Sequence, residues 1–410
     1  MKKKILIYGI NFAPECLGIG KYTSDMAIWL ADHGYEVSVV TAPPYYPAWS
    51  LQKGYSRWRY TRENFCGMEI LRCPIYVPAM PNGIKRILHL LSFAATSFPA
   101  ILLKALNWRP DLIWVVEPPL FIAPAALVAS RLIGSRSWLH IQDFEVDAFF
   151  SLKFHEGRIV EKIVRSLETS LLKKFQVVTT ISHKMISLAA EKGVDPGRLT
   201  IFQNWVNPAD IYPMEKQNAF REQLKLDDQT FVLLYSGNFG EKQGLEIIIK
   251  AARDLKDRKQ IRFILAGDGA VRSRIVSMTD DLENITFLAI QPTEKLNELL
   301  NLADVHLLPQ RGAVSDLVLP SKLSGILSSG RPVIATAVPG SELDRAVRGH
   351  GIAIPPEDVD ALKQAILTLE KNKDERLRMG ADARRYAVAN WGRDQVLGDL
   401  NRKISDLIGG

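Results

Sequence analysis

The chain of 410 residues is poor in the signals that would assign it to a specialised class of protein. Its three cysteines, Cys16, Cys66 and Cys73, are too few for a disulfide framework, and no Cys/His spacing typical of a zinc site occurs. The first apolar run is too short for a signal peptide and lacks a small-residue cleavage site. No stretch reaches the roughly 18–20 uninterrupted apolar residues of a membrane-spanning helix. With 47% hydrophobic and 24% charged residues, we therefore expect a cytoplasmic, multidomain globular protein.

Positive charge is concentrated in the first half of the chain. Residues 1–200 hold 24 Lys and Arg against 16 Asp and Glu, a balance of +8, whereas residues 201–410 hold 28 against 29, a balance of −1. This asymmetry predicts that the first half faces something anionic. Because no basic and aromatic nucleic-acid recognition motif is present, a phospholipid surface is favoured over nucleic acid.

Both halves alternate short apolar runs with helical patterns, which predicts a doubly wound α/β fold. In the second half, for example, we expect strands at residues 231–236, 261–266 and 305–308. We expect two Rossmann-like domains that face each other across a cleft. Their predicted boundaries are residues 1–205 and 217–390, joined by a Pro- and Asn-rich linker at 206–216. The helix expected within residues 391–410 either stays with the second domain or crosses back to the first.

Two glycine-containing loops have the composition of anion-binding sites. Gly18 and Gly20 precede a helix, but about eight residues separate them from the first strand, so they make a poor dinucleotide fingerprint, and a simple tight turn is the alternative. The segment SGNFGEKQG, which includes Gly237, follows a predicted strand and precedes a helix, and its Lys242 supplies a charge for a diphosphate. A solvated surface lysine is the alternative there.

Two further loops fall at the same predicted edge of the second sheet. Asp268, in a Gly-Asp-Gly turn, either caps the next helix or touches a ligand. Pro320, Ser321 and Lys322 form a predicted helix start, where backbone donors and a lysine converge. Together with Lys242, they predict a cradle for a nucleotide diphosphate.

Seven segments resemble, in the same order, those of family 4 glycosyltransferases, and most closely the subgroup that builds colanic acid and other exopolysaccharides. The resemblance spans nearly the whole chain. It implies the GT-B fold, a nucleotide-sugar donor held mainly by the C-terminal domain and an acceptor on the N-terminal domain. It also implies transfer with retention of anomeric configuration, without a cofactor or metal ion. The segments are GINFAPECLGIGKYTSDMAIWLADHGYEVSVVTAPPYYP, WVVEPPLFIAPAA, TTISHKM, YSGNFGEKQGLE, LAGDG, ADVHLLPQ and LPSKLSGILSSGRPVIAT.

The resemblance also implies roles for individual residues. Lys242 matches the diphosphate-binding lysine of the family, and Asn238 stands where an arginine is usual. Gly18 and Gly20 match the loop that closes over the donor phosphates. Asp143 falls near the position of a polar residue beside the reacting sugar, with a helix cap or turn as its alternative. His140 is a second catalytic candidate, although its place in mid-strand favours a core histidine.

One departure from the family concerns two glutamates that many members carry eight positions apart. Counting back from the G-x-P-V-I-A strand, these positions are Leu317 and Gly325, neither of which is acidic. Asp316 lies one residue from the first and is a candidate substitute. The segment from Pro320 to Lys322 indicates a subgroup that holds its donor through backbone amides and lysine instead.

Residues 81–104 form an unusually apolar stretch with basic residues at its ends, interrupted by Pro99. We expect two helices there, and two interpretations stay open: a surface that rests on a membrane, or a buried helical pair. The first interpretation places the protein peripherally on the inner face of the plasma membrane, acting on a polyprenyl-diphosphate-linked oligosaccharide.

Three hypotheses for the function remain. The leading one is a retaining glycosyltransferase that moves a hexose or deoxyhexose, of fucose or mannose type, in exopolysaccharide synthesis. A nucleotide-sugar epimerase of the same two-domain shape is the second. The third, prompted by the missing glutamates, is a catalytically degenerate donor-binding subunit.

Overall fold

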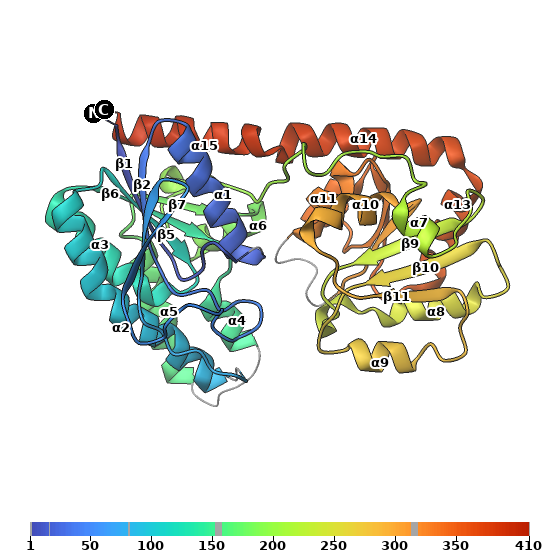
Figure 1. The fold of residues 1–410 in the computed structure, drawn as a ribbon, viewed down its shortest axis with the longest axis horizontal. Coiled ribbons are helices and arrows are strands. Elements are labelled where there is room, and N and C mark those ends of the chain that lie inside the picture. Colours follow the sequence, from blue (N-terminus) through green and yellow to red (C-terminus); the bar gives the residue numbers. More distant parts are fainter. Residues whose placement is uncertain (1, 16, 81–82, 152–157, 313–318, 410) are drawn as a thin grey trace. The chain divides into compact units, whose positions relative to one another are not determined.

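The computed structural model describes residues 2–15, 17–80, 83–151, 158–312 and 319–409. The chain divides into two compact units. Unit 1 comprises Met1–Gln203 together with Leu397–Gly410, and unit 2 comprises Asn204–Val396. Each unit is a sheet covered by helices on both faces (Figure 1), which confirms the prediction of two doubly wound α/β domains.

Unit 1 is built on an eight-stranded sheet in the order β3-β4-β2-β1-β5-β6-β7-β8. All neighbouring strands are parallel except β3 and β4, which pair antiparallel at one edge. The central strands are apolar and almost entirely buried, as expected of parallel strands covered on both faces. The strands are β1 (Lys4–Tyr8), β2 (Glu36–Thr41), β3 (Thr61–Phe65), β4 (Met68–Arg72), β5 (Leu112–Glu117), β6 (Arg136–Ile141), β7 (Val177–Thr180) and β8 (Leu199–Ile201). The helices are α1 (Gly18–Asp32), α2 (Gly83–Trp108), α3 (Ala123–Ile133), α4 (Glu145–Ser151), α5 (Arg158–Leu172) and α6 (His183–Glu191), with short 3-10 turns η1 (Leu120–Ile122) and η2 (Pro196–Arg198).

Unit 2 has a six-stranded, fully parallel sheet in the order β11-β10-β9-β12-β13-β14. Because the chain reverses direction across the sheet beside β9, the loops after β9, β10 and β12 lie next to one another at the carboxyl edge. The strands are β9 (Phe231–Ser236), β10 (Ile261–Ala266), β11 (Ile285–Leu288), β12 (Val305–Leu308), β13 (Val333–Thr336) and β14 (Gly351–Ile354). The helices are α7 (Ala219–Gln223), α8 (Glu246–Asp254), α9 (Arg272–Ser277), α10 (Leu296–Asn301), α11 (Lys322–Ser328), α12 (Glu342–Val347), α13 (Val359–Lys371) and α14 (Lys373–Trp391), with 3-10 turns η3 (Glu241–Gln243) and η4 (Thr293–Lys295).

The last helix, α15 (Arg393–Ile408), begins in unit 2 and ends in unit 1. Its side chains Leu397, Leu400 and Ile404 are buried. The Tyr35 hydroxyl donates to Asn401 at 2.8 Å, and Lys403 donates to the Thr200 hydroxyl at 2.6 Å. The end of the chain is therefore part of the packing of unit 1.

The helix α2 is a single element of 26 residues with Pro99 inside it, so the expectation of two helices was wrong. Pro99 and Ala95, whose carbonyl loses its amide partner, both lie on the exposed face, so the break in the hydrogen-bond ladder is at the solvent side of the helix. By length and composition alone α2 would suffice to cross a membrane. One of its faces packs on unit 1, however, where Ser97 is hydrogen bonded to the Tyr8 hydroxyl at 2.6 Å.

Candidate functional site

The loops after β9 and β10 are hydrogen bonded to each other at the carboxyl edge of the unit 2 sheet. The Gly237 amide donates to the Ala266 carbonyl at 2.9 Å, and the Phe239 amide donates to the Asp268 carbonyl at 2.8 Å. The Val271 amide donates in turn to the Phe239 carbonyl at 3.0 Å. The two loops thus form one rigid backbone platform.

Two glycines make this platform possible. A Cβ atom on Gly267 would lie 1.9 Å from the Gly237 carbonyl oxygen, and one on Gly269 would lie 2.4 Å from the Phe239 carbonyl oxygen. Both residues also adopt positive φ angles, of 147° and 155°. Any side chain at either position would separate the loops, since these distances are far below van der Waals contact.

Lys322, the first residue of α11, packs against this platform at Gly237. Its ammonium donates to the Tyr235 hydroxyl at 2.8 Å and lies 4.2 Å from the centroid of the Tyr235 ring. A Cβ atom on Gly237 would lie 2.6 Å from the Lys322 Nζ atom, so the lysine fits against the bare backbone of that glycine. Burial lowers the pKa of Lys322 to about 8, because the charged form loses solvation. A bound anion would restore that lost stabilisation.

Lys242 lies in the η3 turn that follows the platform, and its side chain is exposed. Within the described part of the chain its ammonium makes no ion pair or hydrogen bond. The turn itself is held by Arg311, whose amide donates to the Lys242 carbonyl at 3.0 Å and whose Nε donates to the Glu241 carbonyl at 2.7 Å. Arg311 also pairs with the Glu246 carboxylate at 3.0 Å. The sequence analysis did not identify Arg311, because only the fold brings the loop after β12 to this turn.

The remaining predicted donor-site residues lie at the same edge and differ in exposure and hydrogen bonding. Asn238 is exposed at the tip of the first loop. Asp268 is exposed and accepts the Gly269 amide at 2.8 Å. It does not cap α9, whose N-cap is Val271 without a side-chain bond, so the capping alternative was wrong.

Three of the predicted positions around α11, namely Pro320, Ser321 and Gly325, are described, and two are not. Ser321 occupies the N-cap position of α11, directly after Pro320, but its side chain makes no capping hydrogen bond. Gly325 lies inside α11. Asp316 and Leu317 lie outside the described residues.

The predicted glycine loop of unit 1 is the first turn of a helix, because α1 already begins at Gly18. Gly20 is buried against Glu15. The Glu15 carboxylate accepts the amides of Tyr45 and Tyr46, each at 2.9 Å, and thereby joins the loop after β1 to the loop after β2. Sequence reasoning missed this role of Glu15, which depends on contacts between distant segments.

His140 is a core residue in this structure. Its side chain is 3% exposed, its Nδ1 atom is 3.0 Å from the Thr179 hydroxyl, and its Nε2 atom is 2.9 Å from the Gln142 amide nitrogen. Burial lowers its pKa to about 3. These contacts agree with the core interpretation of His140.

Asp143 is exposed just after β6, at an edge rich in carboxylates. Glu117, the last residue of β5, is fully buried, and its pKa is raised well above the ordinary value by desolvation and by the nearby acids Glu168 and Glu145. Burial also raises the pKa of Glu145 to about 7. The carboxyl edge of unit 1 therefore gathers carboxyl groups, two of them with raised pKa values, whereas that of unit 2 presents lysines.

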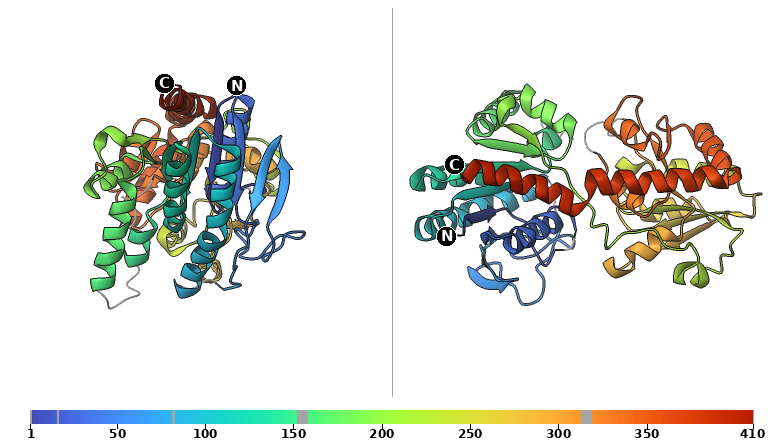
Figure 2. Two further views of the ribbon diagram at one scale, coloured as in Figure 1. Left: turned by 90° about the vertical axis from the view of Figure 1, so that its left-hand side faces the viewer. Right: turned by 90° about the horizontal axis from the view of Figure 1, so that it is seen from above.

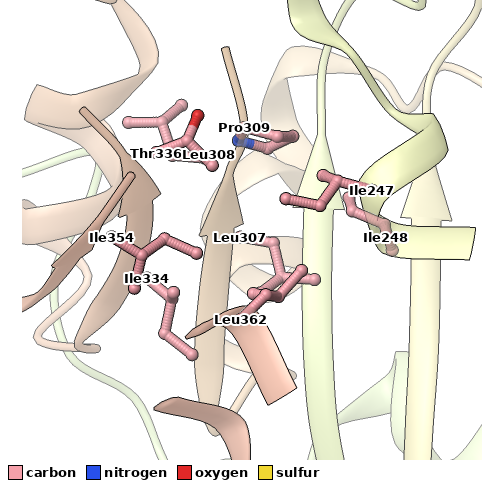
Figure 3. Close-up of a pocket in the computed structure, with 9 residues that line it drawn as sticks. All are labelled: Ile247, Ile248, Leu307, Leu308, Pro309, Ile334, Thr336, Ile354 and Leu362. Carbon is pink, nitrogen blue, oxygen red and sulfur yellow. The ribbon is translucent and has the colours of Figure 1, made fainter. Parts of the chain in front are cut away.

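A small apolar cavity in unit 2 is not a ligand site. Its volume is about 10 Å³, which is at most the space of one water molecule. Figure 3 shows aliphatic side chains from β12, β13, β14, α8 and α13 around it, with Thr336 as its polar neighbour. The Thr336 hydroxyl already donates to the Gln310 carbonyl at 2.7 Å. The described residues also contain no group of three or more His, Cys, Asp or Glu arranged to hold a metal ion.

Comparisons with known proteins match both units. Residues 18–205 match the family model of the glycosyl transferase 4-like domain, and residues 216–386 match that of glycosyl transferases group 1. The chain is 41% identical, over 99% of its own length and the full length of the relative, to an Escherichia coli K12 protein described as the colanic acid biosynthesis glycosyl transferase WcaI.

Solved structures share the fold at low sequence identity. Sucrose-phosphate synthase from Thermosynechococcus elongatus superposes with a TM-score of 0.77 at 18% identity, and the match covers 100% of both chains. Anabaena Alr3699/HepE in complex with UDP-glucose superposes with a TM-score of 0.70 at 14% identity, covering 98% of this chain and 99% of that protein.

Proposed function

The chain belongs to the glycosyltransferases of the GT-B fold, with a glycosyl transferase 4-like domain followed by a group 1 domain, and from this premise we propose its reaction. It transfers a hexose or deoxyhexose, of fucose or mannose type, from a nucleotide-diphosphate sugar to a lipid-linked oligosaccharide in exopolysaccharide synthesis. The full-length identity to WcaI supports the synthesis of colanic acid or a related polymer. The UDP-glucose complex of HepE supports the class of donor.

The observation that carries this proposal is the presence of two lysines at the sheet edge where glycines let the loops after β9 and β10 pack closely. Lys322 is held against the bare backbone of Gly237, and Lys242 lies in the next turn. Two ammonium groups and close backbone approach are what a diphosphate requires. We assign the donor diphosphate to this edge of unit 2, with Gly237, Asn238, Asp268, Pro320 and Ser321 around it.

The proposed transfer retains the anomeric configuration. The acceptor hydroxyl attacks the anomeric carbon from the face that the diphosphate leaves. The bond from that carbon to the phosphate oxygen breaks, the new glycosidic bond forms, and the hydroxyl proton passes to the departing phosphate. Lys242 and Lys322 stabilise the charge that develops on the leaving group, and Lys322 is already held in position by Tyr235.

The acceptor in this proposal binds unit 1, near Asp143 at the carboxyl edge of the sheet. Because the acceptor is linked to a polyprenyl diphosphate, the protein works on the inner face of the plasma membrane as a peripheral, cytoplasmic enzyme. The basic excess of the first half and the exposed apolar side chains of α2 support this location.

A thermal-shift panel of nucleotide diphosphates and their sugars, followed by transfer to a polyprenyl-linked acceptor, tests the proposal. We expect one nucleotide to stabilise the protein and its sugar to appear on the acceptor, with the anomeric configuration of the donor in the NMR spectrum of the product. Transfer should continue in EDTA, since no metal ion takes part. Donor binding without transfer or hydrolysis would instead support the degenerate donor-binding subunit, and an inverted product would refute retention.

A further inference from the structure

The helix α5 has its polar and apolar faces reversed relative to those of an ordinary surface helix. Its exposed side chains are aliphatic: Ile159 is 76% exposed, Ile163 54% and Leu167 60%. These positions recur every four residues and share one face. An ordinary helix of a globular protein buries such a stripe, so the outward stripe needs a partner other than the core of unit 1.

The inward face of α5 is charged. Glu168 is buried and pairs with Lys192, and Lys192 also lies 2.8 Å from the Asp147 carboxylate. Arg165 pairs with Asp147 and, at 2.9 Å, with Glu161. These ion pairs tie α5 to α4 and to Lys192, the residue that follows α6, in this orientation. The apolar stripe is therefore a fixed outward feature.

Two neighbouring helices extend the apolar surface. Figure 2 (left) shows α2, α3 and α5 side by side in the layer that faces the viewer. On α2 the exposed apolar residues include Leu88, Leu91, Phe98 and Leu103, and on α3 Leu132 is exposed. We call the outward surface of these three helices the α2-α3-α5 face.

The charges on this face have one sign. Neither α2 nor α3 contains an Asp or Glu, and the two acids of α5 are held in the ion pairs with Arg165 and Lys192. The exposed charged side chains on this face are cationic: Lys85, Arg131 and Lys162. A second copy of the chain would bring like charges together, whereas an anionic bilayer offers both a complementary charge and an apolar layer.

We propose that the α2-α3-α5 face docks on an anionic phospholipid bilayer and that α5 inserts its outward stripe of Ile159, Ile163 and Leu167 at the level of the lipid headgroups. This inference rests on the proposed function in one respect, namely that a lipid-linked acceptor brings the enzyme to a bilayer. It adds which surface makes the contact and assigns a role to a helix that the donor and acceptor sites do not use.

Flotation of the full-length protein with vesicles of phosphatidylcholine, with or without phosphatidylglycerol, tests the proposal. We expect the wild type to bind only the anionic vesicles and to be released at high salt. The double variant Ile163→Gln/Leu167→Gln should bind about tenfold or more weakly, since two partly inserted aliphatic side chains are lost. Leu377→Gln, which alters an exposed leucine of α14 in unit 2, is the matched control and should bind like the wild type.

Three results would overturn the proposal. These are failure of the wild type to float with anionic vesicles at low salt, unchanged binding of the α5 double variant, or a concentration-dependent dimer that the double variant abolishes. Transfer to a detergent-solubilised acceptor separates this proposal from the proposed function. The double variant should retain that activity, because it leaves the donor site intact, and if the wild type lacks it the proposed reaction fails whatever the vesicles show.

Discussion

The carboxyl edges of the two sheets present different ionisable groups, although the two units are built alike. At the unit 2 edge Lys322 lies against Gly237, and Arg311 holds the turn that contains Lys242. At the unit 1 edge Glu117 and Glu145 are buried carboxyls whose pKa values are raised. Yet unit 1 contains the half of the chain with the excess of +8. The net charge of a domain therefore does not locate its site: the nearly neutral half presents the basic edge.

This difference also indicates which kind of ligand each edge would bind. A basic edge fits an anionic donor, whereas an edge of carboxyls fits a sugar acceptor, whose hydroxyl groups donate hydrogen bonds. The basic excess of the first half is then left for the α2-α3-α5 face.

Of the changes at the unit 2 edge, removal of the Lys242 side chain should lower turnover the most. We expect Lys242→Ala to lower turnover by about 100-fold to 1,000-fold, as loss of one preorganised group at a developing charge does, while the melting temperature stays unchanged. Steady-state kinetics with the donor identified by thermal shift measure the effect. Lys250→Ala, an exposed lysine of α8, is the control. Wild-type turnover in Lys242→Ala would remove Lys242 from the donor site.

Forcing the two glycine loops apart should have the next largest effect. Gly267→Ala places a Cβ atom 1.9 Å from the Gly237 carbonyl oxygen, so we expect a loss of about 3 kcal/mol or more in the free energy of unfolding of unit 2. Gly340→Ala is the matched control, because that glycine also has a positive φ but an open surrounding. Chemical denaturation measures both, and equal losses would refute the interlocked platform.

Arg311 should affect the donor site indirectly. Arg311→Ala removes the hydrogen bond to the Glu241 carbonyl and the pair with Glu246, so the turn with Lys242 loosens. We expect the KM for the donor to rise about tenfold, with a smaller change in kcat. Arg274→Ala is the control: its side chain pairs with the carboxylates of Glu241 and Glu246 only and should change KM less than threefold, about the effect of a surface ion pair. Equal effects would contradict a positioning role for Arg311.

The smallest expected effects concern pH. The buried ionisable groups of the two edges should change the stability of the protein in opposite directions as the pH rises. The pKa of Glu145 is raised to about 7, so between pH 4.5 and about 7 the folded chain keeps a proton that the unfolded chain loses, and stability falls as the pH rises. The pKa of Lys322 is lowered to about 8, so between about pH 8 and 10.5 the unfolded chain binds the extra proton, and stability increases as the pH rises.

Denaturation curves across the pH range measure these slopes. Glu145→Gln should flatten the acidic slope and Lys322→Met the alkaline one. An unchanged slope in either variant would assign that pH dependence to other groups.

The sequence predicted the central strands well and the edges poorly. Residues 231–236, 261–266 and 305–308 coincide with β9, β10 and β12, because buried parallel strands form short, continuous apolar runs. The strands β8 and β11 were not predicted, since every residue in them is only half-buried and shows no such run. The prediction of two helices on either side of Pro99 was wrong for a different reason. A proline alone indicates a helix break, whereas packing of the buried face of α2 maintains one helix.

The candidate site was predictable only in part. Lys242 and Lys322 could be proposed from the sequence because glycine-rich loops and helix starts have local signals. Arg311 and Glu15 were not, since each joins loops that are far apart in the sequence. The carboxyl cluster of the unit 1 edge was also hidden, because Glu117 and Glu145 come together with Asp143 only when β5 and β6 pair.

The return of α15 to unit 1 has a consequence for how the protein is made. Residues 2–203 leave the ribosome well before Leu397, Leu400 and Ile404, which belong to the same packed body. At about 5–20 residues per second the delay is roughly 10–40 s. During that interval the apolar surface that α15 will cover is open, while unit 2, a continuous segment, is being completed. The nascent chain thus has a window for aggregation, and for chaperone binding, that closes only after the last helix is released.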